Sequence, residues 1–276
     1  MPVNLLLCEG VEKSPDIRVL SKLLVGRCEV RALGGKYGMG ERILARRETL
    51  KGDVVFGVLD GDFHEAWTPP ENHPRRWIVQ SPERHLGWRW ERKEIENYLI
   101  DPIVAGHALG WTESERTLYS AVLIAARDRI ASYQAARTAL SVSRVRFKPL
   151  SNQWGRPIGR DKHELPIDFS VEVCRTKINE LIQAHNESQA IDEAATTSSF
   201  ERLMTECGSG GCRSEAFLHA FAGKDLLWAM QSDMPTLGFN SSAVFMERVL
   251  VGLRSAADIG SWLPEWKELR HAVDSI

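Results

Sequence analysis

The stretch Leu5-Leu6-Leu7-Cys8-Glu9-Gly10 is a short apolar run that ends in a carboxylate and a glycine. Such a run, bounded by a turn residue, is typical of a strand that is buried on both faces of a parallel sheet. Parallel sheets place their functional groups at the carboxyl ends of the strands. The stretch therefore predicts a central strand with Glu9 at its functional end.

A second apolar run repeats this pattern further along the chain. Residues 53–59 are mainly apolar and are followed by Asp60, Gly61 and Asp62. Side chains alternate along a strand with a period of two residues, so both aspartates face the same way if the extended geometry continues through Gly61. We expect Glu9, Asp60 and Asp62 to converge at one edge of the sheet.

The segments around these runs predict alternating helices and strands. Ser14 and Pro15 are typical of a helix start, and apolar residues follow them at helical spacing. Residues 28–33 predict another strand, a glycine-rich turn follows, and a helix is expected at about residues 40–50. Residues 64–85 predict a loop, a strand at 77–79 and another loop. This alternation indicates an α/β fold with a doubly wound, mostly parallel sheet.

The second half of the chain predicts helices with one basic interruption. The helical patches cover residues 112–140, 170–184, 199–206, 214–221 and 241–253. The interruption, at about residues 144–163, mixes basic with aromatic side chains, which is the composition of a surface that follows a nucleic-acid backbone. Its candidate nucleic-acid-binding residues are Arg144, Arg146, Lys148, Trp154, Arg156, Arg160 and Lys162. A solvated loop between helices is the alternative.

Composition excludes some classes of protein. The 276 residues carry a formal net charge of −2, so any nucleic-acid binding must come from a local surface rather than from a basic chain. The five cysteines are odd in number and scattered, which is typical of a reducing compartment. No stretch approaches the ~20 apolar residues of a membrane span. We expect a cytoplasmic protein that does not enter a membrane.

The carboxylates at the predicted sheet edge indicate metal chemistry. Carboxylates that lack a histidine or cysteine partner are hard oxygen ligands, the type that Mg²⁺ or Mn²⁺ prefers. Mg²⁺ is usually held by a few carboxylates together with phosphate oxygens, so the pattern favours chemistry on phosphodiesters. Each motif taken alone also has an ordinary alternative, since Asp-Gly-Asp after a strand is often only a turn.

The pattern resembles the TOPRIM domain, the Rossmann-like catalytic fold of topoisomerases, bacterial primases and several nucleases. The resemblance covers residues 1–105 and is carried by Glu9 and Gly10 after the first strand and by Asp60-Gly61-Asp62 after the third. It implies that Glu9, Asp60 and Asp62 bind Mg²⁺ or Mn²⁺. Within this family the chain looks most like the OLD-family nucleases and the DUF4435 proteins of phage-defence operons.

This closer resemblance implies further site residues. Asp16 is the best match to an acid that follows the first glutamate, although the loop before it is longer than usual. Glu96, and next Glu94, match the ligands of a second metal. On a helix these two would point apart, so at most one is expected to reach the site unless the stretch is irregular. Lys224 matches a downstream catalytic lysine, with an ordinary surface lysine as the alternative.

The sequence thus predicts a TOPRIM-like catalytic domain at residues 1–105 and a mainly helical region at residues 106–276. Completion of the active site by this second region is an open alternative. The expected function is a Mg²⁺- or Mn²⁺-dependent nuclease that hydrolyses DNA or RNA with Glu9, Asp60, Asp62 and Lys224 as catalytic residues. One alternative is a regulatory or effector subunit that is inert without a partner; another is a non-catalytic nucleotide-binding protein. No P-loop is present, so any ATPase is a separate subunit. A homo-oligomer is a further possibility that the sequence leaves open.

Overall fold

A five-stranded sheet forms the centre of the molecule. The structure, a computed structural model, describes residues 2–275 apart from residues 36, 50–53, 62, 64–65, 81–82, 145–156, 160–161, 164–167, 169 and 190. The strands of the sheet are β1 (Leu5–Cys8), β2 (Glu29–Ala32), β3 (Val55–Leu59), β4 (Arg75–Gln80) and β5 (Glu83–Arg89). They lie in the order β2-β1-β3-β5-β4, and only β4 is antiparallel to its neighbour. The predicted α/β fold with a mostly parallel sheet is confirmed.

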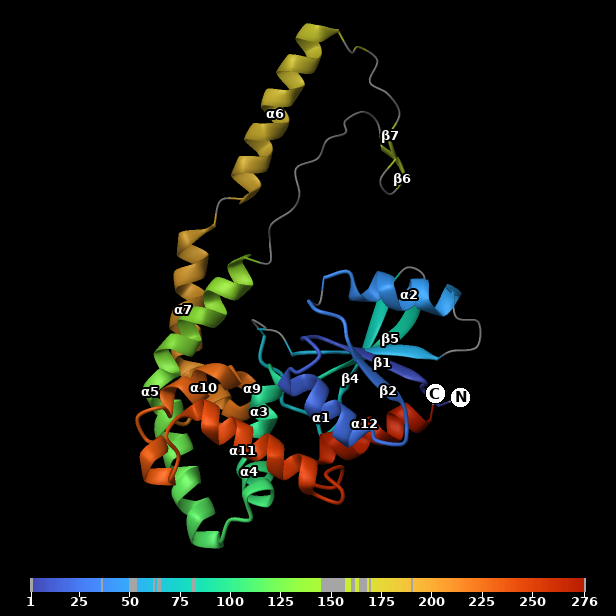
Figure 1. The fold of residues 1–276 in the computed structure, drawn as a ribbon. Coiled ribbons are helices and arrows are strands. Elements are labelled where there is room, and N and C mark those ends of the chain that lie inside the picture. The colour runs from blue at the N-terminus through green and yellow to red at the C-terminus, as the bar shows by residue number, and fades with distance from the viewer. Residues whose placement is uncertain are drawn as a thin grey trace.

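Helices cover both faces of this sheet. Leu6 and Cys8 of β1 point to one face and pack with α1 (Pro15–Leu23), whereas Leu5 and Leu7 point to the other face and pack with α2 (Met39–Thr49). Figure 1 shows α2 on one side of the sheet and α1 on the opposite side. Every residue of β1 is buried, as the apolar run predicts.

The strand β5 corrects the sequence prediction, which placed a loop after residue 79. Residues 83–89 instead form the strand between β3 and β4. Gly87 of β5 pairs with Gly57 of β3, so the two strands meet where neither has a side chain. Because a glycine and a histidine interrupt the apolar pattern of β5, its sequence lacks the periodicity that marks a strand.

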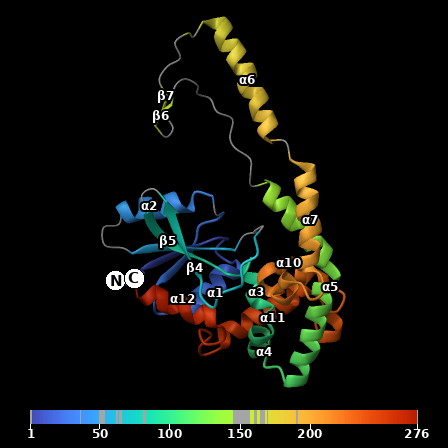
Figure 2. The same cartoon turned by 180° about the vertical axis from the view of Figure 1, so that it is seen from behind.

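The second half of the described chain is mainly helical, as predicted. Its helices are α3 (Ile95–Leu99), α4 (Pro102–Leu109), α5 (Glu113–Arg144), α6 (Val171–Gln189), α7 (Glu193–Cys207), α8 (Cys212–Glu215), α9 (Phe217–Ala220), α10 (Gly223–Ala229), the 3₁₀ helix η1 (Met234–Leu237), α11 (Ser242–Ser255) and α12 (Pro264–Asp274), and a small hairpin, β6 (Pro157–Gly159) with β7 (Lys162–His163), lies between α5 and α6. The helices α5 and α7 run side by side, and α6 extends away from the sheet in both views (Figures 1 and 2). None of the described helices has the length and apolarity needed to cross a membrane.

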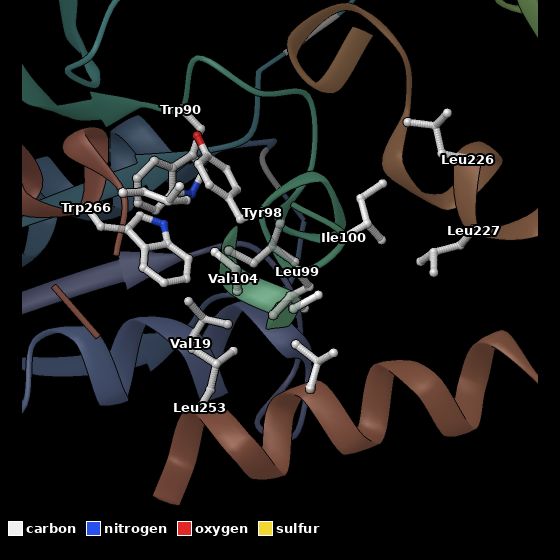
Figure 3. Packing of buried hydrophobic residues seen from close by; sticks show 14 of the residues in the cluster. Val19, Trp90, Tyr98, Leu99, Ile100, Val104, Leu226, Leu227, Leu253 and Trp266 are labelled. Atoms are coloured by element: carbon white, nitrogen blue, oxygen red, sulfur yellow. The ribbon is translucent and has the colours of Figure 1, made fainter. Parts of the chain in front are cut away.

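One hydrophobic core joins the two halves of the chain. Trp266 of α12 stacks on Tyr98 of α3 with the ring centroids 6.0 Å apart, and Tyr98 also contacts Trp90 at 5.0 Å (Figure 3). Beside them, Val19 of α1 and Leu253 of α11 belong to the same cluster. The last helix of the chain therefore covers part of the face that α1 leaves open.

A buried carboxylate lies at the edge of this aromatic cluster. Glu265 accepts a hydrogen bond of 2.6 Å from the Tyr98 hydroxyl and one of 2.8 Å from the backbone N–H of Glu91. Burial raises the pKa of Glu265 to about 7, because the two hydrogen bonds offset only part of the cost of desolvating its charge.

This raised pKa makes stability depend on pH. The folded state keeps the proton of Glu265 at pH values where the unfolded chain, with the ordinary value of 4.5, has released it. The contribution of this carboxyl to stability is therefore fully present below about pH 4.5 and is lost as the pH rises to about 7. Replacing Glu265 by Gln should remove a stability change on the order of 3 kcal/mol over this range.

Urea unfolding at several pH values would measure the effect. Glu268 is exposed on the same helix, so Glu268→Gln is the matched control and should follow the wild-type curve. Parallel curves for wild type and Glu265→Gln would show that this carboxyl does not titrate as described.

Candidate active site

Glu9 and Asp60 follow two adjacent parallel strands. Cys8, the last residue of β1, pairs with Val58 of β3, so the residues that follow the two strands lie at the same edge of the sheet. The backbone N–H of Asp60 donates a hydrogen bond of 3.3 Å to Oε1 of Glu9. The structure thus brings these two predicted residues together.

Asp16 joins them from the start of α1. Gly10 turns the chain with a φ of +96°, a conformation that residues with a Cβ rarely adopt, and this turn leads toward α1. A Cβ at Gly10 would lie 2.4 Å from Oγ of Ser14 and 3.4 Å from Oδ2 of Asp16. The glycine after Glu9 therefore allows Asp16 to approach the end of β1.

Glu94 and Glu96 both contact Lys224, because the stretch that holds them is not one regular helix. The helix α3 begins at Ile95, and Glu94 precedes it with extended φ and ψ of −146° and 158°. Because Glu94 is not on the helix, the rule that helical residues two apart point away from each other does not apply.

Lys224 contacts both glutamates from the start of α10. Its Nζ lies 3.5 Å from Oε1 of Glu94 and 3.4 Å from Oε2 of Glu96, and its backbone N–H donates a 3.0 Å hydrogen bond to Oε2 of Glu94. Partial burial lowers the pKa of Lys224, but the two glutamates outweigh it and the net shift is upward. Lys224 is therefore a cation held between two carboxylates.

Asn97 fixes the distance between α3 and α10. Its Oδ1 accepts a hydrogen bond of 3.0 Å from the N–H of Gly223, and its Nδ2 donates one of 2.8 Å to the carbonyl of Phe221. The helices approach so closely that a Cβ at Gly223 would lie 2.5 Å from the backbone nitrogen of Asn97. Lys224 is placed by this contact.

A third contact holds the loop after β3. The Phe63 ring lies between two cations, with Nζ of Lys93 4.0 Å and Cζ of Arg137 5.0 Å from its centroid. Arg137 of α5 also forms an ion pair with Asp225, the neighbour of Lys224. Neither Phe63 nor Arg137 is predicted from the sequence, because no local pattern marks a residue within a long helix as the partner of a loop.

The carboxylates at this edge repel one another. Burial raises the pKa of Asp60 to about 8, and the negative charges of Asp16, Glu9 and Glu96 add to the effect while Lys224 opposes it. Burial likewise raises the pKa of Asp16 to about 6, with Glu96 and Glu9 contributing. The pKa of Glu96 is raised by burial against the attraction of Lys224. One lysine does not balance this cluster.

The donor set of the cluster fits a hard divalent cation. All of its side chains present carboxylate oxygens, the ligands that Mg²⁺ and Mn²⁺ prefer. Oε2 of Glu96 is buried and has no hydrogen-bond partner among the described residues, although Lys224 is near enough for an ion pair. Within the part of the chain that the structure describes, no three such side chains are already arranged as a metal site.

Several predicted residues are beyond what the structure describes. Asp62, Arg146, Lys148, Trp154, Arg156 and Arg160 lie outside the described residues. The structure gives only the backbone of Arg144, at the end of α5, and of Lys162, in β7. The basic segment is therefore still a prediction from sequence.

Comparison with protein-family models found no match, and a search of curated proteins found none either.

Replacing Gly223 by Ala tests the close approach of α3 and α10. Ala is the better helix former by about 1 kcal/mol, so helix propensity alone predicts stabilisation. The contact with Asn97 predicts the opposite, a loss of about 1–3 kcal/mol in the free energy of unfolding. Gly35→Ala is the control, because a Cβ there meets nothing within 4 Å, and it should be nearly neutral. A more stable Gly223→Ala in chemical unfolding would contradict the described contact.

Proposed function

We propose that this protein is a Mg²⁺- or Mn²⁺-dependent nuclease with a TOPRIM-like, Rossmann-like catalytic domain. The observation that carries the proposal is the convergence of acids from three separate segments with Lys224 at the carboxyl edge of a parallel sheet. The acids are Glu9, Asp16, Asp60, Glu94 and Glu96. A partly buried excess of negative charge at this edge is unfavourable unless a cation joins it.

The described acids would hold the metal in distinct ways. Glu9 and Asp60 lie directly after the central strands and are the proposed main ligands, with Asp62 as their partner from sequence. Asp16 and Glu96 approach the same edge from two helices. A bound divalent cation would polarise the phosphate and lower the pKa of a water molecule, so that hydroxide forms more readily at neutral pH.

Lys224 supplies a positive charge that belongs to the protein itself. In phosphodiester hydrolysis a water oxygen loses a proton and bonds to phosphorus, and the bond from phosphorus to one ester oxygen breaks as that oxygen takes up a proton. Negative charge gathers on the other phosphate oxygens in the transition state. Lys224 is held by Glu94 and Glu96, yet 61% of its side chain is exposed, so its ammonium group can contact a substrate phosphate. A fixed cation at this position stabilises the charge of the transition state.

A second candidate function is an effector subunit that needs a separate ATPase subunit for activity. The observation that favours it is the apolar stripe of α6, on which Val171, Ile178 and Ile182 are 76%, 50% and 44% exposed. Gel filtration of the protein with a co-expressed operon neighbour, followed by a cleavage assay with and without ATP, separates the two candidates. Cleavage by the isolated protein at the same rate as by the mixture would reject the second one.

Activity should depend on both the metal and the carboxylates. We expect the wild type to cleave plasmid DNA, single-stranded DNA or tRNA with Mg²⁺ or Mn²⁺ and not with EDTA. Asp60→Asn and Glu9→Gln should lower the rate about 10²-fold or more. Their melting temperatures should stay the same or rise, because each variant removes one carboxyl group from a cluster of neighbouring acids. Glu172→Gln, an exposed site on α6, is the control and should retain full activity.

Metal binding has a readout that does not need catalysis. A ligand that binds only the folded state at 100 times its dissociation constant stabilises it by ~2.7 kcal/mol, so Mn²⁺ should raise the melting temperature of the wild type. The rise should be smaller in Glu96→Gln and absent in Asp60→Asn. An equal rise in wild type and Asp60→Asn would mean that the ion binds elsewhere.

A further inference from the structure

Two strongly exposed aromatic side chains lie on segments that are tied to the candidate active site. Among the tryptophan, tyrosine and phenylalanine side chains of the described residues, Tyr37 is the most exposed at 86% and Trp228 follows at 77%. Large aromatic surfaces are usually buried, since leaving them in water forgoes a large favourable transfer free energy. Neither ring is therefore used in the core, and both are free to contact a ligand.

Trp228 lies on the same face of α10 as Lys224. The two residues are four apart on one helix, which places their Cβ atoms about 6 Å from each other. The buried face of α10 is formed by other residues, including Leu226 and Leu227, so packing of the helix does not require the indole. The ring thus stands one helical turn from the cation that contacts Glu94 and Glu96.

Tyr37 lies in a different segment, the loop between β2 and α2. It follows β2, which is parallel to β1, so its loop emerges where Glu9 emerges. Gly34 of this loop is bonded to Gly10 through two backbone hydrogen bonds of 2.8 and 3.0 Å. The loop that carries Tyr37 is thereby tied to the residue next to Glu9.

We infer that Trp228 and Tyr37 are stacking platforms for nucleobases and that the site takes nucleic-acid strands whose bases are unstacked. This inference rests on the proposed nuclease function. A base has two π-faces that stack on aromatic side chains without regard to sequence, and in a duplex the neighbouring base pairs cover these faces. A base on Trp228 would hold its own phosphate within reach of Lys224. Single-stranded DNA or RNA is therefore the substrate class, with Trp228 as the main specificity residue.

A strand with and without bases separates stacking from charge. The probes are fluorescent single-stranded 12-mers of DNA and RNA. The control is a DNA 12-mer with the same sugar-phosphate backbone in which every nucleotide lacks its base. Binding is followed by anisotropy in the Asp60→Asn background, so that no strand is cut, at two salt concentrations. We expect Trp228→Leu to bind the base-bearing strands about 5- to 150-fold more weakly, which is ~1–3 kcal/mol at 1.4 kcal/mol per tenfold, and to bind the abasic strand as before.

Matched variants complete this experiment. Trp228→Phe keeps a ring and should retain most of the affinity, and Tyr37→Leu should weaken binding in the same selective way. Val171→Ala removes an equally exposed apolar side chain on α6, far from the sheet in Figure 1, and should change nothing. The salt dependence should be the same in all variants, because none removes a charge. The melting temperature of Trp228→Leu should match that of its parent, since the indole is not in the core.

The small diester bis(p-nitrophenyl) phosphate distinguishes this inference from the proposed function, because it has no bases. Failure of the wild type to hydrolyse it or any strand with Mn²⁺ would overturn the nuclease proposal. Equal binding of base-bearing and abasic strands, unchanged binding by Trp228→Leu, or no binding of single strands at all would overturn the stacking inference, whether or not the diester is hydrolysed. Trp228→Leu that loses strand cleavage but hydrolyses the diester at the wild-type rate supports both.

Discussion

The hydrogen bonds of Asn97 are the interaction on which the rest of the candidate site depends. A single buried amide bonds to the backbone on both sides of the start of α10, at Phe221 and at Gly223. Its own backbone belongs to α3, the helix that carries Glu96. Since an unpaired buried amide is costly, these bonds keep the two helices at one separation. Lys224 follows Gly223 directly, and its own backbone N–H is hydrogen-bonded to Glu94, which places its side chain beside Glu94 and Glu96.

This arrangement explains how a cluster of partly buried acids exists in a folded protein. Each carboxylate is tied to an element that is stable for other reasons. Glu9 and Asp60 end strands that are packed on both faces, and Asp16 begins a helix whose opposite end lies in the core. The favourable packing of these elements thus offsets the repulsion among the charges. Clusters of like charges with shifted pKa values are common where proteins bind ions or act as enzymes.

The sequence was informative where local rules govern position. The two apolar runs predicted parallel strands whose carboxyl ends place Glu9 and Asp60 at one edge, and helical spacing found most of α5 and α11. It failed where a contact between distant segments decides the outcome. Glu94 was assigned to a helix that begins one residue later, a boundary that single sequences define poorly. The approach of Arg137 to Phe63 depends on the packing of α5 against α10, which no periodicity encodes.

The packing of Trp266 on Tyr98 has a consequence for the chain as it is synthesised. Glu9, Asp60 and Glu96 leave the ribosome long before Trp266, and a nascent chain that holds all three still lacks the helix that covers Tyr98. Lys224 is also still to come at that stage. Domains tend to fold as units during translation, once their sequence is available. The acids of this protein are therefore synthesised early, whereas Lys224 and the helix that covers Tyr98 are synthesised late. A chain released from a ribosome between α3 and α10 contains the carboxylates but lacks the lysine and the packing that surround them.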